Sequence, residues 1–284
     1  MDLLDTHQHL ICRDQIGYGW TAGLPPLRSG DFTLADYQAL TAGQGVIGQV
    51  FMETGVDDAD YQTEARMVAG LMRPGSGLLG QIASCRPETD TGFAVWLAEC
   101  AGLQVVGFRR ILHEISDDLS QSDTFRRNIR TIGATGRPFD MCFRANQLHL
   151  AVDLARACPD MEFVLDHCGV PDIGGGITGG AFGAWQTGIT AVAALPNITC
   201  KLSGITAYCA PGTASTATLR PWVDHILHAF TPARIIWGSD WPVVNLGGGL
   251  PGWITMTREL LAGLTVAERS AIGTGNARRV YGLP

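Results

Sequence analysis

Lysine is almost missing from this chain. Of the 20 basic residues 19 are arginines, and Lys201 is the one lysine. Acidic residues outnumber basic ones, giving a formal net charge of −7 and a pI near 5.4. This charge balance disfavours nucleic acid and anionic membranes as partners, since both attract basic proteins.

Several targeting and cofactor signals are missing as well. No uninterrupted apolar stretch is long enough to span a bilayer, and the first residues lack the charged and apolar regions of a signal peptide. The eight cysteines form no C-x-x-C pair, which predicts reduced, mostly buried thiols in a cytoplasmic protein. The pattern G-x-x-x-x-G-K-[ST] is also absent, which argues against a phosphate-cradling loop.

What the chain does contain is apolar residues in short runs. Hydrophobic residues make up 46% of the sequence, enough for a buried core. Several runs are continuous rather than alternating, as expected of parallel strands covered on both faces. The predicted strands are Asp2–Thr6, Val46–Met52, Leu78–Ser84, Leu103–Arg109, Phe139–Phe143, Glu162–Asp166, Ile198–Leu202 and Arg234–Gly238.

Helical patterns lie between these runs. The predicted helices are Asp57–Leu71, Thr91–Ala101, Ser122–Thr135, Gln147–Ala157, Leu219–Ala229, Met256–Ala262 and Ala267–Ile272. Alternating strands and helices predict an α/β fold, a (β/α)8 TIM barrel with parallel strands, formed by a single domain over residues 1–284. The glycine-rich stretches Gly174–Gly183 and Gly247–Gly252 each follow a strand, so we expect them to be active-site loops.

Four polar side chains stand where three of the predicted strands end. His7 and His9 are two positions apart, so their side chains point the same way from the first strand. His167 follows the sixth predicted strand, and Asp240 follows the apolar end of the eighth. An isolated buried carboxylate is costly unless it is paired or bound to a metal. We therefore expect these four groups to act together, with a pair of hydrogen-bonded core histidines as the alternative for His7 and His9 alone.

These residues also carry a resemblance to a known family. The ordered set His7-x-His9, Asp166-His167-x-Gly169, Lys201-Leu202-Ser203-Gly204 and Gly238-Ser239-Asp240-Trp241-Pro242 resembles the amidohydrolase superfamily. Within it, the chain is similar to the metal-variable branch of L-fuconolactonase-like and 2-pyrone-4,6-dicarboxylate lactonase-like enzymes. The resemblance extends to Gly275–Arg279 and thus spans essentially the whole chain.

The resemblance implies a distorted TIM barrel that hydrolyses a sugar-acid or pyrone lactone. On this reading Asp240 is the general base for the attacking water, and His167 polarises the carbonyl or completes a metal shell. His7 and His9 either hold a divalent metal together with Asp240 or bind the carbonyl directly.

The missing lysine bears on the number of metals. Dinuclear members of the superfamily bridge two metals with a carboxylated lysine early in the barrel, and no lysine precedes Lys201. We therefore expect one divalent metal, preferably Zn²⁺, or none. Zn²⁺ would lower the pKa of a bound water and act as a Lewis acid.

Substrate recognition is expected from residues at neighbouring strand ends. An arginine there could fork onto a carboxylate or hydroxyls, although a salt bridge to a helix is an equal alternative. The candidates are Arg109, Arg110, His113, Glu53, Arg144, Lys201 and Trp241. The expected partner is a small-molecule lactone, with assembly into a homo-oligomer left open.

Two other reactions fit the same pattern. A zinc-dependent non-oxidative decarboxylase uses a similar barrel and a similar His/Asp set. A lactone isomerase would use the carboxylate to activate a substrate hydroxyl instead of water. A binding protein that has lost catalysis is the weakest reading, because every expected reactive position is filled.

Overall fold

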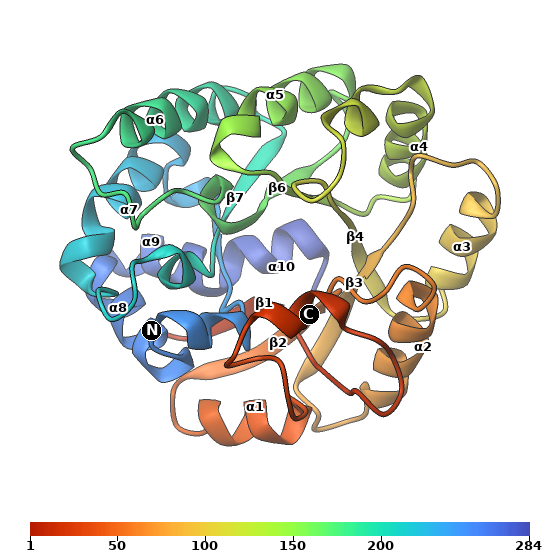
Figure 1. Ribbon diagram of the computed structural model, residues 1–284, viewed down its shortest axis with the longest axis horizontal. Helices are drawn as coiled ribbons and strands as arrows, with labels where there is room; N and C mark the ends of the chain where they lie inside the picture. Colours follow the sequence, from red (N-terminus) through yellow and green to blue (C-terminus); the bar gives the residue numbers. More distant parts are fainter.

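The computed structural model describes residues 1–284 and consists of a ring of strands surrounded by helices (Figure 1). The strands form an eight-stranded sheet in the order β1 to β8, and each neighbouring pair is parallel. Their bounds are Leu3–Gln8 (β1), Val46–Met52 (β2), Leu78–Ser84 (β3), Val105–Ile111 (β4), Phe139–Cys142 (β5), Phe163–Leu165 (β6), Ile198–Leu202 (β7) and Ile235–Trp237 (β8). The predicted barrel is confirmed.

The first and last strands meet through side chains and backbone. Gln8 forms a parallel bridge with Trp241, and the Thr6 hydroxyl donates to the Trp237 carbonyl at 2.7 Å. Asp5 accepts from the backbone N–H groups of both His7 and Ser239, at 3.0 and 2.7 Å. These contacts place the residues that follow β8 directly beside the end of β1.

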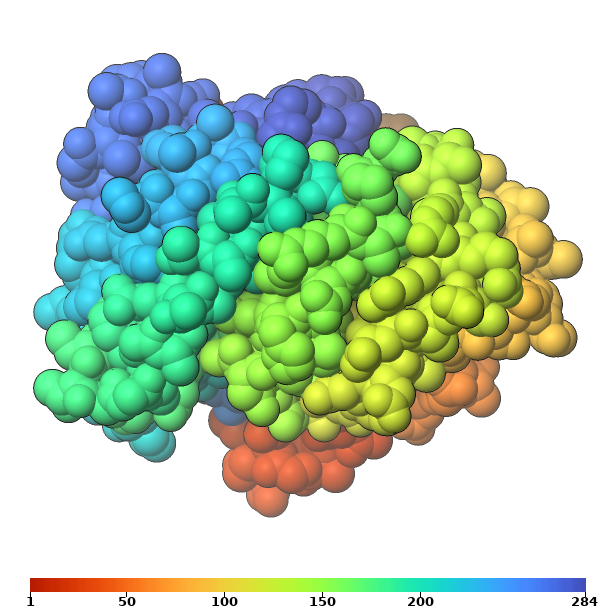
Figure 2. Space-filling view, turned by 90° about the horizontal axis from the view of Figure 1, so that it is seen from above, coloured from red at the N-terminus to blue at the C-terminus, as the bar shows by residue number.

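The structure contains ten α-helices. They are Leu34–Thr41 (α1), Tyr61–Leu71 (α2), Phe93–Cys100 (α3), Asp123–Gly133 (α4), Leu148–Ala157 (α5), Gly180–Ala193 (α6), Thr216–Phe230 (α7), Leu250–Leu260 (α8), Val266–Ser270 (α9) and Asn276–Tyr281 (α10). In the space-filling view successive segments lie side by side, from yellow through green and cyan to blue (Figure 2). No helix combines the length and the apolar character needed to cross a membrane.

Several element boundaries differ from the prediction. Strand β1 continues to Gln8 rather than ending at Thr6, and α2 begins at Tyr61 rather than Asp57. The sequence patterns did not reveal α1, α6 or α10.

The predicted loop Gly174–Gly183 was wrong in its last residues, because α6 already begins at Gly180. Glycine disfavours helices, but here it lets two helices approach closely. A Cβ on Gly188 of α6 would lie 2.7 Å from the Leu148 side chain of α5. Packing therefore outweighs propensity in this segment. The second predicted loop, Gly247–Gly252, is likewise shortened by the start of α8 at Leu250.

Candidate active site

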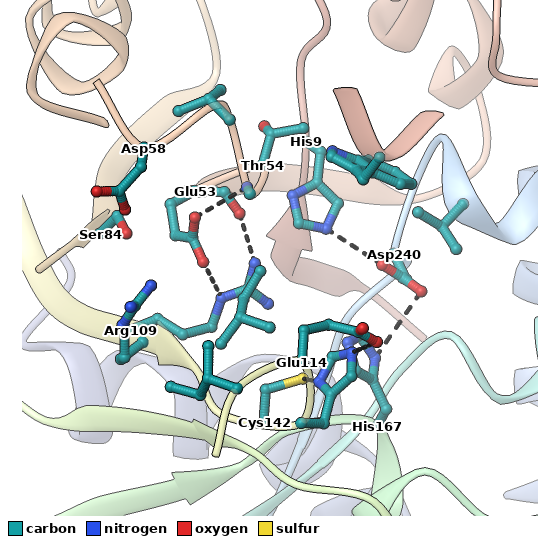
Figure 3. Close-up of a pocket in the computed structure, with 18 of the residues that line it drawn as sticks. His9, Glu53, Thr54, Asp58, Ser84, Arg109, Glu114, Cys142, His167 and Asp240 are labelled. Carbon is teal, nitrogen blue, oxygen red and sulfur yellow. Dashed lines mark hydrogen bonds and ion pairs between the residues drawn. The ribbon is translucent and has the colours of Figure 1, made fainter. Parts of the chain in front are cut away.

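A cavity of about 710 Å³ opens at the carboxyl ends of the strands (Figure 3). Seven of the residues singled out from the sequence line it: His9, Glu53, Arg109, Arg110, His113, His167 and Asp240. His7 lies directly beneath them and is inaccessible to solvent. The barrel thus gathers groups that are more than 230 positions apart in the chain.

His9 is oriented by the backbone of β2. Its Nδ1 lies 2.9 Å from the Met52 carbonyl oxygen, which can only accept a hydrogen bond, so Nδ1 carries the proton. Nε2 faces Asp240 Oδ1 at 3.2 Å. A neutral imidazole has one N–H, and the Met52 carbonyl already accepts it, so His9 Nε2 and Asp240 Oδ1 are both hydrogen-bond acceptors. They attract each other only when a proton or a cation lies between them.

Asp240 lies at the centre of the cluster, and the backbone holds it there. Its φ of +60° is in the left-handed region, and its N–H donates to the His7 carbonyl at 2.7 Å. The carboxylate is 3.8 Å from His7 through Oδ1 and 3.8 Å from His167 through Oδ2. Gly204 makes room for this arrangement, since a Cβ there would lie 2.3 Å from Asp240 Oδ2.

His167 also adopts a left-handed conformation, with φ of +52°. Its Nδ1 lies 3.0 Å from the hydroxyl of Ser203, which follows β7. Burial lowers the pKa of His167, and the charge of Asp240 only partly opposes this effect. The imidazole is therefore neutral near pH 7 and carries one N–H.

A second charged layer lies below the histidines. Lys201 binds Asp140 and lies 3.1 Å from Asp166 Oδ1, and all three side chains are inaccessible to solvent. Burial tends to raise the pKa of Asp166, but the charge of Lys201, the contact with His7 and the charge of Arg109 outweigh it and hold the pKa well below its usual value. For Asp140 burial prevails over Lys201 and raises the pKa to about 7.

This layer was only partly foreseen. Lys201 does not line the cavity, where the sequence placed it as a substrate ligand. Asp140 was not singled out, although an aspartate inside the apolar strand Phe139–Cys142 was a usable signal. Its second partner is the Tyr281 hydroxyl of α10, at 2.8 Å.

The two adjacent arginines of β4 have different surroundings. Arg109 is buried and donates from Nε to Glu53 Oε1 at 2.6 Å and from Nη1 to Asp166 Oδ2 at 3.4 Å. Burial raises the pKa of Glu53, but the Arg109 charge outweighs it and the pKa is lowered overall. Arg110 lines the cavity and donates instead to Glu88 at 2.7 Å.

Of the remaining candidates only His113 lines the cavity. His113 Nδ1 lies 3.1 Å from the Cys142 thiol, and burial lowers the His113 pKa to about 4. Arg144 is outside the main cavity and pairs with Glu114 at 2.7 Å. Trp241 lies behind the cavity, with its ring edge-on to Tyr37. Trp20, Cys142 and Tyr208 also line the cavity.

The donor set fits a divalent metal. His7, His9 and Asp240 offer ligand atoms within 4.8 Å of one another, and so do His7, Asp166 and His167. Imidazole nitrogens and a carboxylate oxygen are ligands that Zn²⁺ prefers. The His9 Nδ1–H held by a backbone carbonyl is the support that ligating histidines usually have.

Comparisons with known proteins agree with this architecture. Residues 4–283 match the family model described as Amidohydrolase. An L-fucono-1,5-lactonase from Burkholderia multivorans is 27% identical over 279 residues, which cover 89% of this chain and 93% of that protein. The uncharacterised protein y4mH from Sinorhizobium fredii is 23% identical, and the match covers 98% of both chains. The crystal structure of a Burkholderia multivorans amidohydrolase with bound zinc has a TM-score of 0.90 at 25% identity and covers 100% of both chains.

Proposed function

The chain belongs to the amidohydrolase family, and on that premise we propose that it opens the ester ring of a sugar-acid lactone, an aldono- or aldarolactone. The observation that carries this proposal is the position of Asp240. Its carboxylate lies at the cavity surface among three imidazoles and 3.2 Å from the nearest, His9. The similarity to an L-fucono-1,5-lactonase over most of both chains supports the choice of an ester ring.

Asp240 acts as the general base in this proposal. Lactone hydrolysis requires a water that loses a proton as it attacks the carbonyl carbon. Once protonated, Asp240 can return this proton to the alkoxide that leaves when the ring opens. The left-handed backbone and the hydrogen bond from its N–H to His7 fix the carboxylate for both transfers.

His167 and Arg109 supply hydrogen-bond donors for the carbonyl oxygen. Negative charge develops on this oxygen during the attack, and donors fixed in a buried site stabilise it most. His167 is neutral near pH 7 and holds one N–H, whereas Arg109 is charged and anchored on Glu53. Both residues line the cavity next to Asp240 or His7.

A divalent ion, with Zn²⁺ preferred, would be held by His9 and Asp240 with support from His7 and His167. When bound, such an ion would lower the pKa of a water and polarise the carbonyl. The outer wall of the cavity, with Trp20, Arg110 and His113, would then contact the rest of the substrate.

A panel of aldono- and aldarolactones, read with a pH indicator, tests the proposal. Hydrolysis releases one proton for each ring opened, so at least one lactone should acidify the solution. Asp240→Asn should lower kcat by about 10²–10⁴-fold, because the base is lost. Asp58→Asn, an exposed carboxylate at the rim of the same cavity, is the matched control and should keep kcat within about threefold.

Two outcomes would count against hydrolysis of a lactone. No acidification with any member of the panel would remove the assigned reaction, and a near-normal rate for Asp240→Asn would remove the assigned base. Release of carbon dioxide from aromatic or enoic acids would point to decarboxylation instead. A change of ring size without net proton release would indicate an isomerase.

A further inference from the structure

Arg109 directly contacts one of the candidate metal ligands. Its Nη1 lies 3.3 Å from His7 Nε2, and the guanidinium is only 3% exposed. The same His7 nitrogen faces Asp240 Oδ1 at 3.8 Å. A desolvated positive charge therefore already stands beside the atom that a metal ion would use.

The direction of this hydrogen bond follows from the chemistry of the two groups. A guanidinium can donate but cannot accept, so the Nε2 lone pair of His7 is the acceptor. A metal ion would need that same lone pair. The other ring nitrogen, Nδ1, lies 3.4 Å from Asp166 Oδ1, which suits the tautomer with its proton on Nδ1.

His9 is in the opposite condition. Its Nδ1 proton is donated to the Met52 carbonyl, and its Nε2 faces Asp240 Oδ1 at 3.2 Å. His9 and Asp240 are thus ready to bind a metal, whereas the lone pair of His7 is engaged by Arg109.

We propose that Arg109 and a divalent metal ion compete for His7, so that Arg109 is the residue that sets the metal affinity of this site. This inference rests on the metal site of the proposed function and adds the residue that tunes it. Arg109 cannot withdraw freely, because its Nε is held by Glu53 Oε1 at 2.6 Å and its Nη2 by the Glu53 carbonyl. The protein then binds metal weakly while the guanidinium stays in place.

Metal affinity of the purified protein, measured without any substrate, tests the inference. Zn²⁺ is titrated in competition with a chromophoric chelator, and Co²⁺ binding is followed by its visible absorption. Arg109→Gln should bind both ions about 100-fold more tightly than the wild type, because two like charges about 4 Å apart repel strongly at a partly buried site. Arg110→Gln removes the same charge from the neighbouring residue, which pairs with Glu88, and should change the affinity less than about threefold.

A second variant guards against misfolding. Arg109→Gln alone leaves the Glu53 carboxylate buried without its partner, which can destabilise the barrel. The double variant Arg109→Gln/Glu53→Gln removes one positive and one negative charge, so the formal net charge remains −7. It should also bind metal more tightly than the wild type, because the guanidinium that engages His7 Nε2 is absent from this variant as well.

The competition is refuted if Arg109→Gln and the double variant bind Zn²⁺ no more tightly than Arg110→Gln, or if neither gains any Co²⁺ absorption. The titration gives its answer whether or not a lactone is hydrolysed. Failure of the lactone panel and failure of the competition are therefore separate results.

Discussion

Replacing Lys201 by methionine should destabilise the barrel strongly, even though the lysine touches no cavity. Lys201 is the one cation bonded to Asp140, and it also contacts Asp166 at 3.1 Å. All three side chains are inaccessible to solvent. Methionine has a similar shape, so the loss is mainly that of the charge.

The size of the effect follows from the burial of the pair. Removing one partner of a buried ion pair leaves an uncompensated charge and costs about 3–5 kcal/mol. The free energy of unfolding should fall by that amount at pH 7.5. Urea unfolding followed by the fluorescence of the seven tryptophans measures it.

The loss should also depend on pH. Burial already raises the pKa of Asp140 to about 7 with Lys201 present, and without the lysine it rises further. A carboxyl group whose pKa is higher in the folded state contributes stability below its unfolded pKa and loses it as the pH rises through the folded pKa. The deficit of Lys201→Met should therefore be larger at pH 8 than at pH 5.

The double variant Lys201→Met/Asp140→Asn is the matched control. Removing the stranded carboxylate should recover at least about 1 kcal/mol, since the two residues are in contact and their effects are not additive. An unfolding free energy of Lys201→Met within about 1 kcal/mol of the wild type, at both pH values, would refute the reasoning.

Three further changes test other parts of the site. Gly204→Ala places a Cβ 2.3 Å from Asp240 Oδ2, so lactonase kcat should fall by about 10²-fold. The control Gly212→Ala is also at positive φ but has open space around it, so it should cost about 1 kcal/mol of stability and keep kcat. Burial lowers the His113 pKa to about 4, so the stability of the wild type should fall as the pH drops from 6.5 to 4. The melting temperature of His113→Gln should depend less on pH over this range, and an unchanged slope would contradict this assignment. The pKa of His167 is also lowered by burial, so kcat should stay constant as the pH falls from 7.5 to 6.5, whereas a loss over this range would show an imidazole titrating at its ordinary pKa.

Much of the architecture could be predicted from local patterns. Strands β2, β3 and β7 have the predicted bounds because each is a short, mostly apolar segment in which most residues are buried. Helix α1 was missed because only Tyr37 and Thr41 are buried in it, which leaves almost no apolar stripe to detect. Helix α6 was missed because its glycines resemble a loop unless the neighbouring α5 is known.

The grouping of His7, His9, His167 and Asp240 was predictable for a related reason. Each stands at or just beyond the end of an apolar strand, and parallel strands in a barrel end on the same side. The partners of each side chain were not predictable. Alternation along a strand says which face a residue occupies but not which atom it meets across the barrel.

The sequence by itself determined the fold class, the end of the barrel that holds the cavity and the residue types gathered there, because these depend on strand periodicity and on the order of polar strand ends. Only the tertiary structure decided that Lys201 lies below the site with Asp140 and that Arg109 lies against His7. Such pairings depend on distances of a few ångströms between different strands. Barrel closure and side-chain packing set those distances, and the spacing of residues along the chain does not record them.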